Sequence, residues 1–123
     1  MDLDNIYMKS IQIYVNNRDI FFRRYVEILN SVLGLRQREL DVLMMLIDYY
    51  DLHWCDMVDR IVFSSDIKKE ICNRLGISDS ILNNCLSSLR SSGIIVGRSV
   101  LRKYLIRYND SVNINFQICH RRK

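Results

Sequence analysis

The chain has 123 residues, enough for one domain with a single hydrophobic core. Hydrophobic residues make up 49% of it and charged residues 26%, which is ordinary for a soluble globular protein. No uninterrupted apolar run approaches the ~18 residues of a membrane helix, and no signal-peptide pattern opens the chain. We therefore expect a cytoplasmic protein with no membrane partner. The four cysteines, at positions 55, 72, 85 and 119, are not closely paired and favour reduced thiols over a disulfide framework.

The formal net charge of +4 is unevenly distributed along the chain. Residues 64–123 carry eleven basic and four acidic side chains, whereas residues 34–63 carry three basic and six acidic ones. Residues 1–33 are balanced, with four of each. An excess of positive charge on one half of a chain is typical of nucleic-acid binding. The alternative is a basic surface that only contributes solubility.

The first third of the chain predicts a strand and two helices. Residues 5–15 are β-branched and aromatic with partial alternation, which predicts a strand. Asn17 can cap a helix through residue 33, where Gly34 would end it. Residues 36–50 have apolar side chains at helical spacing, with Glu39 in place for a capping box but no hydroxyl at Arg36.

Residues 51–62 are harder to interpret, and either a short helix or an ordered loop fits them. Four acidic residues in and just before this segment would repel a phosphate backbone: Asp48, Asp51, Asp56 and Asp59. We therefore expect this region to lie away from nucleic acid.

The segment from residue 63 to 105 carries the most informative pattern. A helix over 65–75 would end at Gly76, and Ser78 is placed to cap a second helix over 79–92. The second helix has one apolar face, made by Ile81, Leu82, Cys85, Leu86 and Leu89. Two short helices joined by a tight turn form a helix-turn-helix, whose second helix would be the recognition helix.

Residues 94–108 predict a β-hairpin, or wing, around Gly97, Arg98 and Ser99, and residues 112–118 alternate as a final strand. The N-terminal strand could pair with this last strand or with the wing, and either pairing would close a small sheet. Residues 120–123 form a short basic tail.

The run RLGISDSILNNCLSSLRSSGIIVGR resembles the winged-helix family of DNA-binding domains. In that family an "LGIS" turn leads into the recognition helix, and "LxxLxxxGxI" leads into the wing, matched here by Leu86, Leu89, Gly93 and Ile95. The likeness covers about residues 34–108 and extends to small phage-encoded proteins of this kind. It implies an α+β fold: a single winged-helix domain (34–118) with an extra N-terminal strand and helix (1–33), a small antiparallel sheet and a basic tail (119–123).

Side-chain chemistry suggests roles for residues of the predicted recognition helix and for the cations beside it. The amides of Asn83 and Asn84 can pair with adenine, and Arg90 can pair with guanine or phosphate. However, Arg90 is the only cation on the exposed face of the recognition helix, which opens with Asp79. Phosphate contacts would then fall to flanking cations, or the helix would dock on protein. The full candidate set is Lys68, Lys69, Ser78, Ser80, Asn83, Asn84, Ser87, Arg90, Arg98, Arg102, Lys103, Arg121 and Arg122.

Enzymatic patterns are missing from the sequence. It has no glycine-rich phosphate loop, and neither His53 nor His120 lies in a recognisable catalytic motif. His53 with Cys55 and Cys119 with His120 lack the regular spacing of a structural zinc site. We therefore expect no enzymatic activity, metal or cofactor.

The leading hypothesis is a protein that binds double-stranded DNA, a sequence-selective transcriptional regulator of phage or bacterial type that could act as a homodimer. The alternative is a phage virion or packaging component, whose winged helix docks on a phage protein partner.

Overall fold

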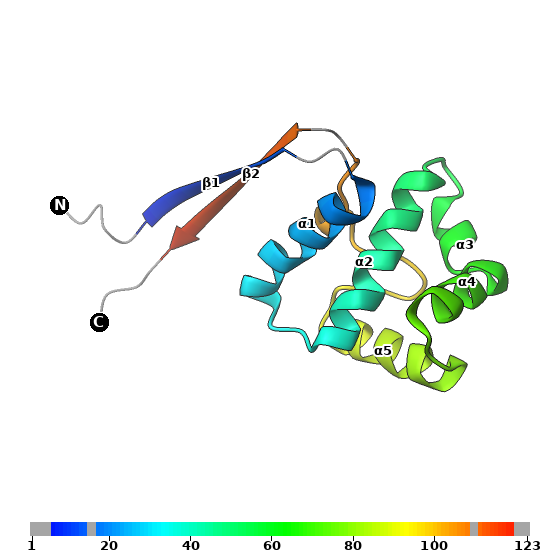
Figure 1. The fold of residues 1–123 in the computed structure, drawn as a ribbon. Helices are drawn as coiled ribbons and strands as arrows, with labels where there is room; N and C mark the ends of the chain where they lie inside the picture. The colour runs from blue at the N-terminus through cyan, green and yellow to red at the C-terminus, as the bar shows by residue number, and fades with distance from the viewer. Residues whose placement is uncertain (1–5, 15–16, 109–110, 120–123) are drawn as a thin grey trace.

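The computed structural model describes residues 6–14, 17–108 and 111–119, and a bundle of five α-helices dominates it (Figure 1). The four helices predicted from the sequence are confirmed, each within two residues of its expected ends. Part of the segment that was open to two interpretations forms a fifth, short helix. The helices are α1 (Arg18–Leu33), α2 (Gln37–Leu52), α3 (Val58–Val62), α4 (Ser65–Leu75) and α5 (Asp79–Ser91).

Local capping explains why the helices begin and end where they do. Asn17 Oδ1 accepts hydrogen bonds from the backbone of Asp19 and Ile20, which fixes the start of α1. At the start of α2, Glu39 Oε1 accepts the backbone N–H of Arg36 at 3.0 Å, so half of a capping box is present without the hydroxyl.

Helix α2 is the centre of the hydrophobic core. Its residues 42–50 are all buried, and it packs against α1, α3, α4 and α5. From α1, Phe21 and Phe22 enter the same core with exposed fractions of 0% and 1%. The first helix therefore belongs to the helical body, while the predicted domain boundaries themselves stay predictions.

The predicted α+β class is wrong, because the body is built from helices and the expected hairpin over 94–108 is not formed. In that segment the strand pairing is reduced to one isolated bridge between Ile95 and Val100. Beyond it the chain makes a 3-10 turn, η2 (Arg102–Tyr104), and then packs apolar side chains of residues 104–106 against the core. Packing against the core thus replaces the second strand of the wing.

Two strands lie outside the helical body. Strands β1 (Ile6–Tyr14) and β2 (Ser111–Cys119) pair in antiparallel register, with Ile11 opposite Ile114 at the centre. Of the two partners considered for the N-terminal strand, the structure has the last strand. Figure 1 shows this ribbon extending away from the helices, so it does not form a sheet layer over the core.

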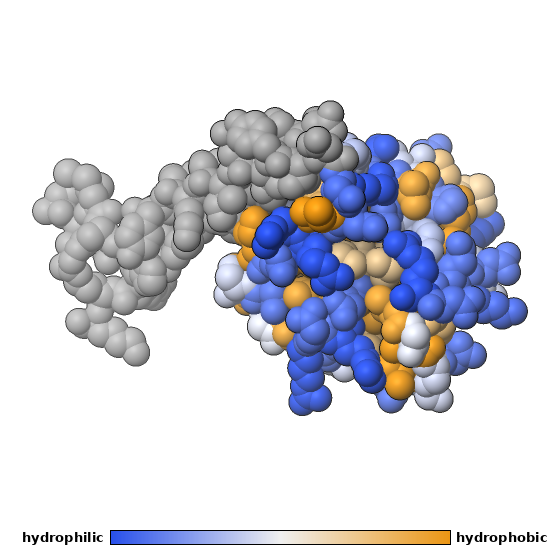
Figure 2. All heavy atoms as spheres, in the orientation of Figure 1, coloured by the Kyte–Doolittle hydropathy of each residue, from blue (hydrophilic) through white to orange (hydrophobic). Residues whose placement is uncertain are grey.

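The surface of the helical body carries both polar and apolar side chains. On the face seen in Figure 2, hydrophilic residues predominate and hydrophobic residues appear as separate patches. Large apolar side chains exposed by about half or more include Leu52, Trp54, Met57 and Val96. No helix in the described part of the chain is long and apolar enough to cross a membrane.

Candidate nucleic-acid interface

A short turn, residues 76–78, joins α4 to α5. Gly76 ends α4 with φ of 64°, a left-handed conformation in which a Cβ would be strained. Ser78 Oγ then accepts the backbone N–H of Ile81 at 3.2 Å and caps α5. Ser78 is among the candidate site residues. Its oxygen is used in the cap, although its O–H can still donate a hydrogen bond to a ligand.

The two faces of α5 are divided as the sequence predicts. Leu82, Cys85, Leu86 and Leu89 are buried, and Ile81 is half-buried against the core. The opposite side exposes polar side chains that can donate and accept hydrogen bonds: Ser80, Asn83, Asn84 and Ser87. We call these four residues the polar face of α5.

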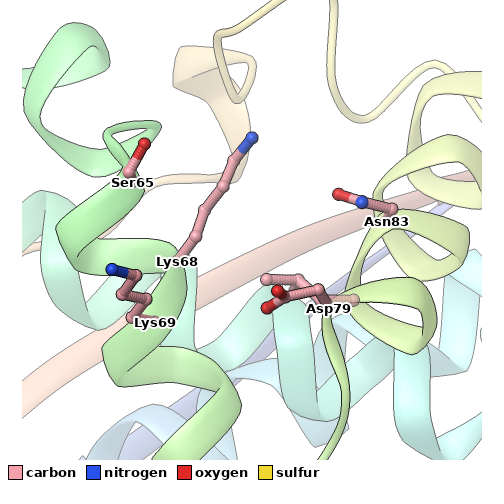
Figure 3. Close-up of a pocket in the computed structure, with 6 residues that line it drawn as sticks. Ser65, Lys68, Lys69, Asp79 and Asn83 are labelled. Atoms are coloured by element: carbon pink, nitrogen blue, oxygen red, sulfur yellow. The ribbon is translucent and has the colours of Figure 1, made fainter.

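A first hollow, of about 280 Å³, separates α4 from α5 on one side of the polar face (Figure 3). Its walls carry Lys68 and Lys69 from α4 and Asn83 from α5. Figure 3 shows Asp79 and Asn83 directed from α5 toward α4, with Lys68 extending toward the open side. Among the described residues neither lysine forms an ion pair, since every ion pair there involves an arginine. The structure thus brings together three of the predicted site residues.

A second hollow, of about 230 Å³, lies on the other side of α5. Asn84 and Ser88 of α5 face Arg36 and Arg38 at the start of α2 across it. Both arginines are exposed, and neither forms an ion pair within residues 17–108. These two arginines are not among the site residues predicted from the sequence, because the acidic residues further along the same segment outnumber them.

Arg90, predicted to contact guanine or phosphate, forms a hydrogen bond with the turn at residues 96–99. Its Nε donates a 2.9 Å hydrogen bond to the backbone carbonyl of Gly97. Arg98, the next residue, is exposed and has no ion-pair partner in the described part of the chain. Arg98 therefore has no acidic partner there and can contact a ligand. Arg90, in contrast, bonds α5 to the backbone of the turn that carries Arg98.

Arg102 is compensated by an acid instead of being free for phosphate. Its Nη2 lies 2.9 Å from Oδ2 of Asp59, and its guanidinium stacks over Tyr50 and Trp54. The hydrogen bond from Arg102, aided by bonds from Tyr50 and Ser99, lowers the pKa of Asp59. Lys103 remains exposed, with its ammonium 5.1 Å from the ring centre of Tyr104. Arg121 and Arg122 lie outside the described residues.

The acidic residues that were expected to repel phosphate are mostly paired with arginines. Asp48 and Asp51 both bind Arg18 of α1 at 2.6 Å, and Asp51 also binds Arg107 at 2.5 Å. Arg74 of α4 lies 3.6 Å from Asp48. Asp48, Asp51 and Asp59 thus hold the bundle together, whereas Asp56 is exposed in the connection before α3.

The cysteines within residues 17–108 differ in their exposure to solvent. Cys72 and Cys85 are buried, as the apolar face predicted for the second helix implies for Cys85, and burial raises the pKa of both thiols. Cys55 is exposed and free. No group of three or more His, Cys, Asp or Glu side chains in the described residues could hold a metal ion. The side chains of Cys119 and His120 lie outside that part.

Comparison with protein-family models, with curated proteins and with solved structures gives no match for this chain. The winged-helix family therefore stays a resemblance of the sequence.

Proposed function

We propose that this chain binds double-stranded DNA through α5 and acts as a sequence-selective transcriptional regulator of phage or bacterial type. One observation carries the proposal: the polar face of α5 lies between two pairs of unpaired cations, Lys68 with Lys69 and Arg36 with Arg38. Hydrogen-bonding side chains flanked by cations match a duplex, in which base edges lie in a groove between two phosphate backbones.

The dimensions of α5 suit this role. Its 13 residues span about 20 Å at ~1.5 Å per residue, and a helix fits the ~12 Å width of the major groove. The amides of Asn83 and Asn84 can each pair with N6 and N7 of adenine, and Ser80 and Ser87 suit several base edges. The four flanking cations would contact phosphates on both sides of the groove.

A second candidate function is docking on a protein, as in a phage virion or packaging component. The observation that favours it is the low charge of α5 itself, where Arg90 is the one cation, its Nε is bonded to Gly97, and Asp79 opens the helix. A polar, weakly charged helix face suits a protein partner as well as a base edge.

Fluorescence anisotropy of labelled duplexes over a salt series tests the proposal. Duplexes selected from a random library should bind more tightly than scrambled ones, and affinity should fall steeply with salt. Replacing both Lys68 and Lys69 by Ala should lower the slope of log K against log salt by about two, and so should replacing both Arg36 and Arg38.

The matched control is Arg24→Ala, because Arg24 pairs with Glu27 on α1 and lines neither hollow. It should leave the slope unchanged. No duplex binding even at ~50 mM salt would reject the DNA proposal. Co-purification of the chain with a phage particle would then support docking on protein.

A further inference from the structure

The turn at residues 96–99, in the segment where a hairpin was predicted, is fixed at its base by the core. Ile95 and Val100, which form the isolated bridge, have exposed fractions of 1% and 0%. Val96 N–H donates to the carbonyl of Ser99 at 2.9 Å and closes the turn. Only a short loop therefore protrudes, and Arg98 is its one charged side chain.

Arg90 fixes this turn from the side of α5. The arginine belongs to the last turn of the helix, and its Nε donates to Gly97 O at 2.9 Å. Gly97 has φ of 64°, so its peptide adopts a conformation that favours glycine. The bond links the end of the recognition helix directly to the residue before Arg98.

Asp59 of α3 is the second residue that fixes the turn. Its Oδ1 accepts Ser99 Oγ at 3.0 Å, and its two oxygens bind Arg102 just beyond the turn. Asp59 also accepts the hydroxyl of Tyr50, which in turn accepts the Val100 N–H at 3.0 Å. Tyr50 is buried in α2, so the turn is anchored to the centre of the core.

We propose that Arg90 is a positioning residue of the DNA-binding surface. By bonding to Gly97, Arg90 holds the guanidinium of Arg98 beside α5 in one position before DNA binds. Asp59 is the second residue that fixes this turn. A cation that is already ordered loses less conformational entropy on binding than one on a mobile loop. The inference rests on the proposed DNA binding and makes the contribution of Arg98 depend on Arg90.

A double-mutant cycle with Arg90→Ala and Arg98→Ala tests this dependence. In the otherwise unchanged protein, Arg98→Ala should weaken duplex binding about eightfold at ~0.1 M salt, the loss of one phosphate contact. In the Arg90→Ala background, Arg98→Ala should weaken duplex binding about twofold or less, since Arg98 is then no longer held in place before binding. In the Lys69→Ala background the full eightfold loss should remain, because Lys69 lies on α4 and the hollow that it lines includes no residue of the turn.

Amide hydrogen exchange of the DNA-free protein gives a readout that does not need binding. In Arg90→Ala the Val96 amide, which donates to Ser99, should exchange faster, while the Leu82 amide inside α5 should not change. Asp59→Asn, which weakens the contacts of Asp59 with Ser99 and Arg102, should likewise speed exchange at Val96 and leave Leu82 unchanged.

Equal effects of Arg98→Ala in the presence and absence of Arg90, or unchanged exchange at Val96, would overturn the inference. If the protein binds no duplex, the proposed function fails. Hydrogen exchange would still decide whether Arg90 orders the turn.

Discussion

Nε of Arg18 lies 2.6 Å from Oδ1 of Asp48, the one charged residue buried in the described part of the chain. Asp48 belongs to the buried stretch of α2, while Arg18 opens α1 and is partly exposed. Arg74 approaches the second oxygen of Asp48 from α4 at 3.6 Å. One carboxylate therefore joins three helices of the bundle, and its charge is tolerated only while these arginines are present.

Arg18→Ala should destabilise the fold strongly. It removes the closest partner of Asp48 and leaves a buried carboxylate with only the more distant Arg74, at a cost of about 3 kcal/mol in the free energy of unfolding. Arg24→Ala is the control, because its pair with Glu27 is exposed and should contribute less than about 0.5 kcal/mol. Urea unfolding monitored by circular dichroism measures both. Equal midpoints for the two variants would contradict the role assigned to Arg18.

The charge distribution shows where the sequence analysis misleads. Residues 64–123 hold the whole basic excess, but three of their arginines neutralise acids of the preceding segment. Arg102 pairs with Asp59, 43 residues away, and Arg107 pairs with Asp51, 56 residues away. Arg74 pairs with Asp48. Such pairs are set by tertiary packing, so a count along the chain cannot find them. The charge count also gave no sign of Arg36 and Arg38, because residues 34–63 are acidic in total.

Local signals predicted the helices well because their causes are local. A cap such as Ser64, or a stop such as Gly76, acts within one helical turn. The buried face of α5 also follows from spacing alone. The wing failed for the opposite reason. Its second half, residues 101–108, lacks strict alternation, and contacts of Tyr104 and its neighbours with the core, which involve residues far away in sequence, determine its conformation.

Acid should weaken the fold through Asp51 and Asp59. Burial of Asp51 opposes ionisation, but hydrogen bonds from Arg107, Arg18 and the backbone of Tyr108 outweigh it and lower its pKa. The pKa of Asp59 is lowered by its bond to Arg102. A carboxyl group with a depressed pKa in the folded state adds stability above its unfolded pKa, and this contribution disappears as pH falls through the folded pKa.

The free energy of unfolding should therefore fall as pH drops below about 4, the usual pKa of an unfolded Asp. Asp59→Asn should be less stable than the original protein at neutral pH, with a shallower loss in acid. Asp56→Asn, at an exposed site without a described partner, should match the original protein throughout. Urea titrations between about pH 2 and pH 7 measure this. Identical pH profiles for Asp59→Asn and the original protein would show that the pair with Arg102 adds no stability.

Asn84 should carry base specificity if the DNA proposal holds. It lies on the polar face of α5 beside the second hollow, and its amide can bind adenine in a bidentate way. Asn84→Ala should cost roughly 1–3 kcal/mol on the preferred duplex and little on scrambled DNA. Ser91→Ala, at the exposed end of α5 away from both hollows, is the control. Equal losses on both duplexes would assign Asn84 to the phosphate backbone.

Asp79 should weaken binding to every duplex, and its removal should strengthen it. Its carboxylate lines the hollow that holds Lys68 and Lys69, where a phosphate would approach (Figure 3). At about 4 Å in water, repulsion between two unit charges amounts to about 1 kcal/mol, and it grows where water is partly excluded. Asp79→Asn should therefore raise affinity for scrambled DNA about fivefold, while the lost charge at the start of α5 lowers stability by about 0.3–1 kcal/mol.

Anisotropy titrations with scrambled duplexes, beside urea unfolding, measure the two effects of Asp79→Asn separately. Asp56→Asn makes the same change of charge away from α5 and should raise affinity much less. If Asp79→Asn and Asp56→Asn strengthen binding equally, the gain reflects net charge alone. The hollow between α4 and α5 would then not be the place where phosphate approaches, and the contact would have to be sought on the side of Arg36 and Arg38.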